Sequence, residues 1–120
     1  MAFQLKDDWL GVFGDKSRIG KPLLSDLSAK KPTFLFLKTL SLAKKNEASV
    51  LLSIAGKEKY SDKQINIVRE IARNCGAEAE CLKKAEQIKD KALNLLMKFP
   101  ESDSRFLLQQ WAKLLLERNY

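Results

Sequence analysis

The chain has 120 residues, of which 45% are hydrophobic and 31% charged, so it has the length of one small domain and the composition of a folded protein. Its formal net charge of +7 favours partners that carry negative charge, but it does not choose among nucleic acid, an anionic membrane surface and a diphosphate ligand. No apolar run approaches the roughly 18 residues of a membrane span, and two cysteines without any histidine predict free thiols and not a zinc site.

Apolar residues recur at helical spacing along the chain, and no segment alternates with period two. The first expected helix spans residues 2–13 and ends at Gly14. Because this helix starts without a cap or a lead-in loop, we expect a fragment of a longer protein, with an uncapped native terminus as the alternative. Residues 15–28 are expected to form a polar loop, and Pro32 opens a second helix that runs to about Lys45.

Four further helices are expected after residue 45. The short helix is expected over residues 46–55. Ser61 and Gln64 have the spacing of a capping box at the start of the next helix, and a long helix follows over residues 77–99. The last helix begins at Ser102 or the residue after it. Its apolar side chains are expected to face inward: Leu107, Leu108, Trp111, Leu114 and Leu115. The pattern therefore predicts an all-α chain of about six helices.

Polar side chains gather on one face of the first expected helix. Gln4 precedes Asp7 by three residues and Asp8 by four, so the three share an aspect of the helix. Neighbouring carboxylates repel each other, and a bound cation relieves that repulsion. Open carboxylates suit Mg²⁺, a hard ion that keeps waters and bridges to phosphate oxygens.

The stretch after this helix adds Lys21, Asp26 and Lys31. A lysine is a mobile point charge that suits a diphosphate. Acidic groups that hold a metal, beside lysines that hold the same phosphates, would form one electrostatic cradle. From residue types alone, a solvated Asp-Asp pair and an ordinary Gly-Lys turn stay open as alternatives.

The order of these residues resembles the second aspartate-rich region of the trans-prenyl diphosphate synthases, the family of the farnesyl and geranylgeranyl diphosphate synthases. The matching stretches are FQLKDDWLGVFGD at 3–15, GKP at 20–22, SDL at 25–27 and KPT at 31–33. Gly11 stands where many members have a third aspartate, and Leu24 and Lys30 replace frequent glycines. The likeness is specific through Lys31 and looser over the terminal helices.

The resemblance implies a metal site. Asp7 would ligate Mg²⁺ that bridges to the allylic diphosphate, Asp8 would be a water-mediated partner, and Asp26 would support the site. The family's first aspartate-rich motif precedes this region and has no counterpart in the chain. The chain would therefore supply one of two carboxylate clusters.

The resemblance also implies substrate contacts. Gln4 would touch the allylic substrate, and Lys21 and Lys31 would bind its diphosphate. Arg118 resembles a basic residue near the carboxyl terminus that closes over isopentenyl diphosphate.

The fold that the resemblance implies is the carboxyl-terminal portion of the all-α isoprenoid (terpenoid) synthase fold. Residues 1–120 would be the end of a polyprenyl synthetase domain, with the second aspartate-rich region at 3–33 and terminal helices at 34–120. The intact parent would be a prenyltransferase of isoprenoid biosynthesis that condenses isopentenyl diphosphate with an allylic diphosphate. We expect a homodimer in the cytoplasm, with an organellar targeting segment upstream of Met1 open as an alternative, and no activity from this chain alone.

Two other functions remain open at this point. One is a non-catalytic subunit or degenerate relative of the synthases that keeps the fold. The other is a basic helical module for nucleic acid or another acidic partner. The lysines, however, are dispersed over many helices and no nucleic-acid-binding motif is recognisable, so we expect no nucleic-acid partner.

Overall fold

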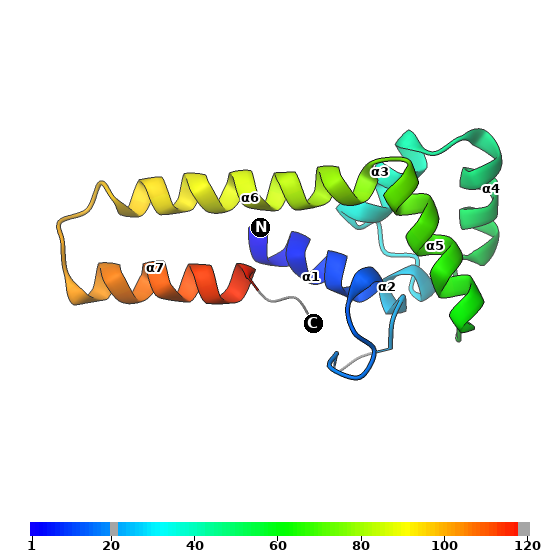
Figure 1. The fold of residues 1–120 in the computed structure, drawn as a ribbon, viewed down its shortest axis with the longest axis horizontal. Helices are drawn as coiled ribbons and strands as arrows, with labels where there is room; N and C mark the ends of the chain where they lie inside the picture. The colour runs from blue at the N-terminus through cyan, green and yellow to red at the C-terminus, as the bar shows by residue number, and fades with distance from the viewer. Residues whose placement is uncertain (20–21, 118–120) are drawn as a thin grey trace.

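The computed structural model describes residues 1–19 and 22–117, with the backbone alone for residues 115 and 116. Within these ranges the chain forms helices and no strand, which confirms the predicted all-α fold. None of the described helices is both long and apolar enough to cross a membrane. The helices, shown in Figure 1, are α1 (Ala2–Phe13), α2 (Ser25–Ser28), α3 (Phe34–Leu42), α4 (Lys45–Ile54), α5 (Asp62–Asn74), α6 (Ala77–Leu96) and α7 (Asp103–Leu116).

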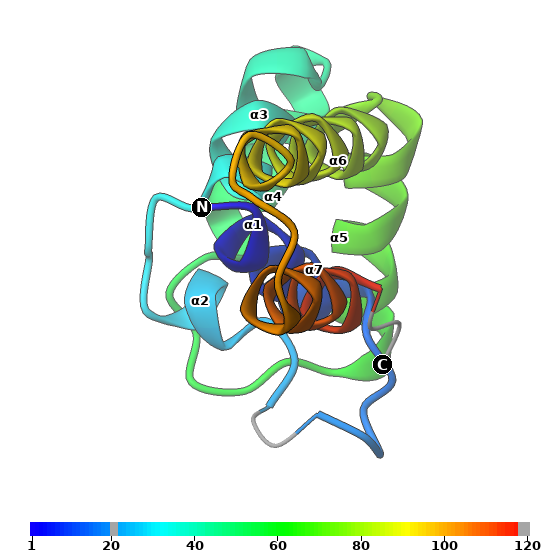
Figure 2. The ribbon, with the colours of Figure 1, turned by 90° about the vertical axis from the view of Figure 1, so that its left-hand side faces the viewer.

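The long helix α6 runs along the longest axis of the molecule, whose extents are 52 × 29 × 20 Å. Helix α1 lies between α6 and α7 and contacts both (Figure 2). Helices α2 to α5 gather at one end, and the hairpin of α6 and α7 extends past the start of α1 at the other (Figure 1). The helix that carries the predicted aspartates is therefore held in the middle of the fold.

Two apolar clusters fix this arrangement, and α5 contributes to both. On α6, Ala77, Cys81 and Ala85 recur every fourth residue, and these small side chains let α1 approach closely. The first cluster comprises Leu23, Leu24, Leu27, Leu51, Ile54, Ile65 and Val68. The second comprises Leu5, Leu35, Ala72, Ala77, Cys81 and Ala85.

Helix α2 lies inside the stretch that was expected to be a loop, so seven helices are described and not about six. The apolar residues Leu23, Leu24 and Leu27 of this stretch insert into the first cluster. Leu24 takes a left-handed backbone conformation, with φ of 63°, and its N–H donates to the Gly11 carbonyl at 2.8 Å. Such a conformation costs an L-residue roughly 1–2 kcal/mol, and the burial of the Leu24 side chain opposes that cost.

Most predicted helix ends are confirmed. The capping box of Ser61 and Gln64 is present, and Ser102 caps α7 by accepting from the Arg105 N–H. Helix α3 begins after its cap Thr33 and ends at Leu42, shorter than the sequence pattern indicates.

The expected inward face of α7 is wrong. Trp111 is 67% exposed. The side of α7 that meets the preceding segment is polar instead, because Arg105 donates to the Phe99 carbonyl at 2.9 Å and Gln109 donates to the Met97 sulfur at 3.0 Å. Leu107, Leu108 and Leu114 are exposed as well, and the side chain of Leu115 lies outside the described part of the chain.

Candidate functional site

A groove of about 580 Å³ lies where α1, α2 and the start of α3 meet α6. Five of the residues predicted for the site line it: Gln4, Asp7, Asp8, Asp26 and Lys31. They come from three segments, so the fold brings together residues that the sequence predicted separately. The other two, Lys21 and Arg118, lie outside the described residues.

Helix α1 presents its polar face to this groove. Gln4, Asp7 and Asp8 follow one another at helical spacing, and Gly11 continues the same face three residues after Asp8. A Cβ at Gly11 would lie 3.7 Å from the Asp26 carboxylate oxygen Oδ2. The Asp26 carboxylate thus occupies the space into which a longer side chain at position 11 would extend.

Asp26 and Lys31 form a short return segment beside α1. The Lys31 N–H donates to the Asp26 carbonyl at 2.9 Å, and the Lys31 Nζ lies 3.7 Å from the Asp26 Oδ1. The Asp26 side chain is 20% exposed, whereas that of Lys31 is 67% exposed. Because an exposed ion pair contributes little free energy, Lys31 can exchange its carboxylate partner for a ligand phosphate at small cost.

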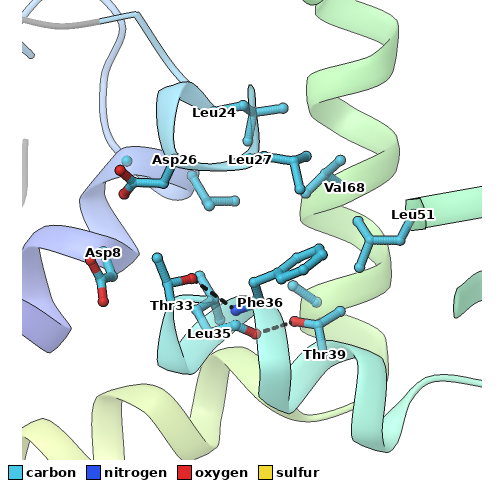
Figure 3. Close-up of a pocket in the computed structure, with 13 residues that line it drawn as sticks. Asp8, Leu24, Asp26, Leu27, Thr33, Leu35, Phe36, Thr39, Leu51 and Val68 are labelled. Atoms are coloured by element: carbon cyan, nitrogen blue, oxygen red, sulfur yellow. Dashed lines mark hydrogen bonds between the residues drawn. The ribbon is translucent and has the colours of Figure 1, made fainter. Parts of the chain in front are cut away.

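Beneath the carboxylates lies a small cavity of about 30 Å³, enough for about one water molecule. Figure 3 shows Asp8 and Asp26 together on one side of it, with the apolar side chains of Leu27, Leu51 and Val68 on the other. Thr33 and Thr39 also line this cavity, so its walls are not entirely apolar. Asp8 and Asp26 line the larger groove as well, so they lie between the cavity and the groove.

Lys84, which reaches the same groove from α6, was not predicted from the sequence. In the sequence it is one of several lysines that would form a solvated face of a long helix. The available signal is its place three residues after Cys81 and one before Ala85, both of which are buried in the second cluster. That spacing puts Lys84 at the edge of the face that meets α1, but the sequence does not reveal that α1 is the neighbour.

The donor atoms fit Mg²⁺ in chemistry. Asp7, Asp8 and Asp26 supply carboxylate oxygens, the ligands this hard ion prefers. Among the described residues, no three acidic, histidine or cysteine side chains stand close enough to form a ligand cluster. Mg²⁺ commonly takes one or two carboxylates together with waters and phosphate oxygens, so an open groove of this kind suits an ion that arrives with a diphosphate.

The family model of polyprenyl synthetase matches residues 1–72, which include every described residue of the predicted site. The chain belongs to the polyprenyl synthetase family. This confirms the resemblance that the aspartate-rich segment predicted.

Relatives of this family member span the rest of the chain as well. A geranylgeranyl diphosphate synthase of Saccharolobus solfataricus is 33% identical over 86% of the chain. A short chain isoprenyl diphosphate synthase of Methanothermobacter thermautotrophicus is 33% identical over 100% of it. The chain covers 31% and 36% of these two proteins, so it spans about a third of the length of the relatives it matches.

Solved structures of synthases share the fold. Geranylgeranyl pyrophosphate synthase from Corynebacterium glutamicum, complexed with isoprenyl diphosphate and magnesium, superposes with a TM-score of 0.87 and 34% identity. The match covers 98% of this chain and 34% of that one. The helices of this polyprenyl synthetase family member thus correspond to one third of a larger helical fold.

Proposed function

We propose that this chain is the carboxyl-terminal part of a polyprenyl diphosphate synthase, a prenyltransferase that condenses isopentenyl diphosphate with an allylic diphosphate. Its part in the reaction is to hold Mg²⁺ and the allylic diphosphate in the groove beside α1. The observation that carries this proposal is the meeting of Asp7, Asp8, Asp26 and Lys31 in one groove of a family member.

The reaction breaks a C–O bond, and the diphosphate departs with developing negative charge. Asp7, Asp8 and Asp26 are the residues that would hold Mg²⁺, which when bound would withdraw part of that charge. The Lys31 and Lys84 ammonium groups face the same groove and stabilise the departing diphosphate by preorganised charge.

Three further contacts complete the proposed binding of substrates. Gln4 lines the groove and orients the allylic substrate. Lys21 adds charge at the diphosphate, and Arg118 closes over isopentenyl diphosphate. The last two roles rest on the family likeness of the sequence alone.

The remaining two thirds of the synthase would supply the other carboxylate cluster and most of the second substrate's site. In support of this, α7 leaves Trp111 67% and Leu114 72% exposed, and an apolar face of that kind is unfavourable in water. We therefore propose that residues 3–33 form the second aspartate-rich region and residues 34–120 the terminal helices of one larger domain. The intact protein would be a cytoplasmic homodimer.

Binding of inorganic pyrophosphate tests the site without requiring turnover. Isothermal titration calorimetry of the 120-residue chain should detect pyrophosphate binding that depends on Mg²⁺. Asp7→Asn should weaken it about tenfold, because a bound cation loses one charged ligand. Asp62→Asn is the matched control, since Asp62 is 87% exposed and pairs only loosely with Lys16 at 3.8 Å. An equal loss in both variants, or no Mg²⁺-dependent binding, would contradict the proposed site.

An activity assay tests whether the 120-residue chain needs the rest of the synthase for catalysis. We expect no condensation of isopentenyl and allylic diphosphates by the 120-residue chain, because removal of even one preorganised contact commonly costs about 10²–10³ in rate. Incorporation of labelled isopentenyl diphosphate measures this. Condensation by the isolated chain would show that the catalytic groups lie elsewhere.

A further inference from the structure

The face of α1 opposite the groove carries a second set of contacts. Lys6, Trp9 and Phe13 follow one another there at helical spacing. The Trp9 and Phe13 rings stack with centroids 5.9 Å apart, and the Lys6 Nζ lies 4.4 Å from the Trp9 centroid. This aromatic strip is the side of α1 that faces α5 and the start of α6.

One carboxylate on α6 links this strip to α5. The Trp9 Nε1–H donates to the Glu78 Oε1 at 3.1 Å, and the Arg73 Nε–H donates to the Glu78 Oε2 at 3.0 Å. The Arg73 guanidinium also lies 5.2 Å from the Phe13 ring centroid. The Glu78 side chain is only 16% exposed, so these charge-assisted bonds are better shielded than a surface ion pair. Trp9, Arg73 and Glu78 together are called the Glu78 clamp.

We propose that Glu78 is a positioning residue for the groove: by holding Trp9, it fixes the rotation of α1 about its axis and so the direction of Asp7 and Asp8. The inference rests on the proposed function of the groove. Successive residues of an α-helix are about 100° apart, so Trp9 points away from the groove while the two residues before it point toward it. A bond at Trp9 therefore acts on the carboxylates through the rigid helix.

Core packing leaves this rotation less well defined in the first two turns of α1, which precede the carbonyls that Leu24 and Arg69 bond at its carboxyl end. Leu5 and Cys81 set the distance between α1 and α6, and the Cys81 Sγ lies 3.7 Å from the Leu5 carbonyl oxygen. Apolar contacts have no preferred direction, whereas a hydrogen bond weakens steeply when it is misaligned. A turn of α1 by roughly 20° would move a side-chain oxygen about 6 Å from the helix axis by about 2 Å, and misplacement by about 1 Å already costs catalytic sites heavily.

Calorimetry of the full 120-residue chain with Mg²⁺ and inorganic pyrophosphate tests the clamp. Glu78→Gln removes the charge that pairs with Arg73 and should weaken binding about tenfold, the worth of one charge-assisted bond. Glu80→Gln is the matched control, because Glu80 lies in the same first turn of α6 and is exposed. The Glu80→Gln affinity should stay within about twofold of the parent, as expected for a surface substitution.

A second variant keeps the test valid if the first does not fold. Trp9→Phe retains a ring on Phe13 but removes the donor to Glu78, so it should weaken binding in the same direction. In a double variant of Trp9→Phe with Glu78→Ala the two effects should not add, because each substitution removes the hydrogen bond between Trp9 and Glu78. Full additivity would show that Trp9 and Glu78 act independently, which would overturn the proposal.

The fluorescence emission of Trp9 tests the Glu78 clamp in the absence of any metal. The chain has two tryptophans, so in a Trp111→Phe background the emission reports Trp9 alone. Glu78→Gln should shift this emission and speed hydrogen exchange of the α1 amides, and Glu80→Gln should do neither. An unchanged emission would overturn the clamp.

The outcomes distinguish the positioning role of Glu78 from the proposed function of the groove. If the parent chain binds Mg²⁺ and pyrophosphate but Glu78→Gln and Glu80→Gln bind equally well, only the role of Glu78 is overturned. If the parent chain does not bind them, the proposed function fails, and the positioning role falls with it even where the emission of Trp9 responds as expected.

Discussion

Replacement of Arg69 by methionine should loosen the carboxyl end of α1. The Arg69 guanidinium donates from Nε to the Val12 carbonyl at 2.6 Å and from Nη2 to the Gly14 carbonyl at 3.0 Å. Partial burial lowers the pKa of Arg69, with the nearby Arg73 charge as a smaller cause, so the side chain has given up water to make these bonds. Methionine keeps most of the stem but no donor. Two bonds to a charged group, discounted for desolvation and partial exposure, suggest a loss of about 2 kcal/mol in the free energy of unfolding.

Urea unfolding followed by circular dichroism at 222 nm measures this loss. The control is Arg18→Met, because the Arg18 side chain is 70% exposed and its Nε lies 3.9 Å from the Asp15 carboxylate. A surface pair of this kind should contribute less than about 0.5 kcal/mol. Equal losses in the two variants would refute the reasoning, since the end of α1 would then not depend on Arg69.

Three further predictions concern the groove and the two thiols. Lys84→Gln should weaken Mg²⁺-dependent pyrophosphate binding about fivefold while Lys83→Gln leaves it unchanged, because a charge acts strongly on a ligand only at close range; calorimetry with equal results for both would remove Lys84 from the site. Burial, with the Asp8 charge as the next cause, raises the pKa of the Cys81 thiol from 9.0 to about 11. The unfolded thiol therefore loses its proton at lower pH than the folded one, and this contribution to stability is lost as the pH rises from about 9 to about 11. The free energy of unfolding, measured by urea titration at each pH across that range, should fall less steeply for Cys81→Ala than for the parent chain. Identical pH dependence in the two proteins would contradict the raised pKa of Cys81. At pH 8 a thiol reagent should modify the half-buried Cys75 first.

The part of the candidate site on α1 could be predicted because its residues lie on one regular helix. Gln4, Asp7 and Asp8 share a helical face by spacing alone, and the helix that carries them runs from Ala2 to Phe13 as the pattern indicates. Local signals also fixed the start of α5, where Ser61 and Gln64 form a reciprocal cap. Such features depend on residues three or four apart, which a sequence displays directly.

Contacts between distant segments of the chain could not be predicted from the sequence. Lys84 reaches the groove only because α6 packs on α1, and Glu78 meets Trp9 across 69 positions of the chain. Periodicity identifies the apolar side of each helix but not the helix it will face. The turn at Leu24 was missed for the same reason: its left-handed conformation accompanies burial in a core to which the distant helices α4 and α5 contribute.

The exposed side of α7 shows how a correct pattern leads to a wrong placement. Leu107, Trp111 and Leu114 recur at helical spacing and were expected to be buried, yet each is at least 60% exposed. A helix with an apolar stripe is stable in water only when something covers that stripe. In the described part of the chain α7 contacts α6 and α1, and its half-buried residues are Arg105, Gln109 and Ala112, not the apolar stripe. Because the chain spans about a third of its relatives' length, we propose that further helices of a larger fold cover the apolar stripe of α7.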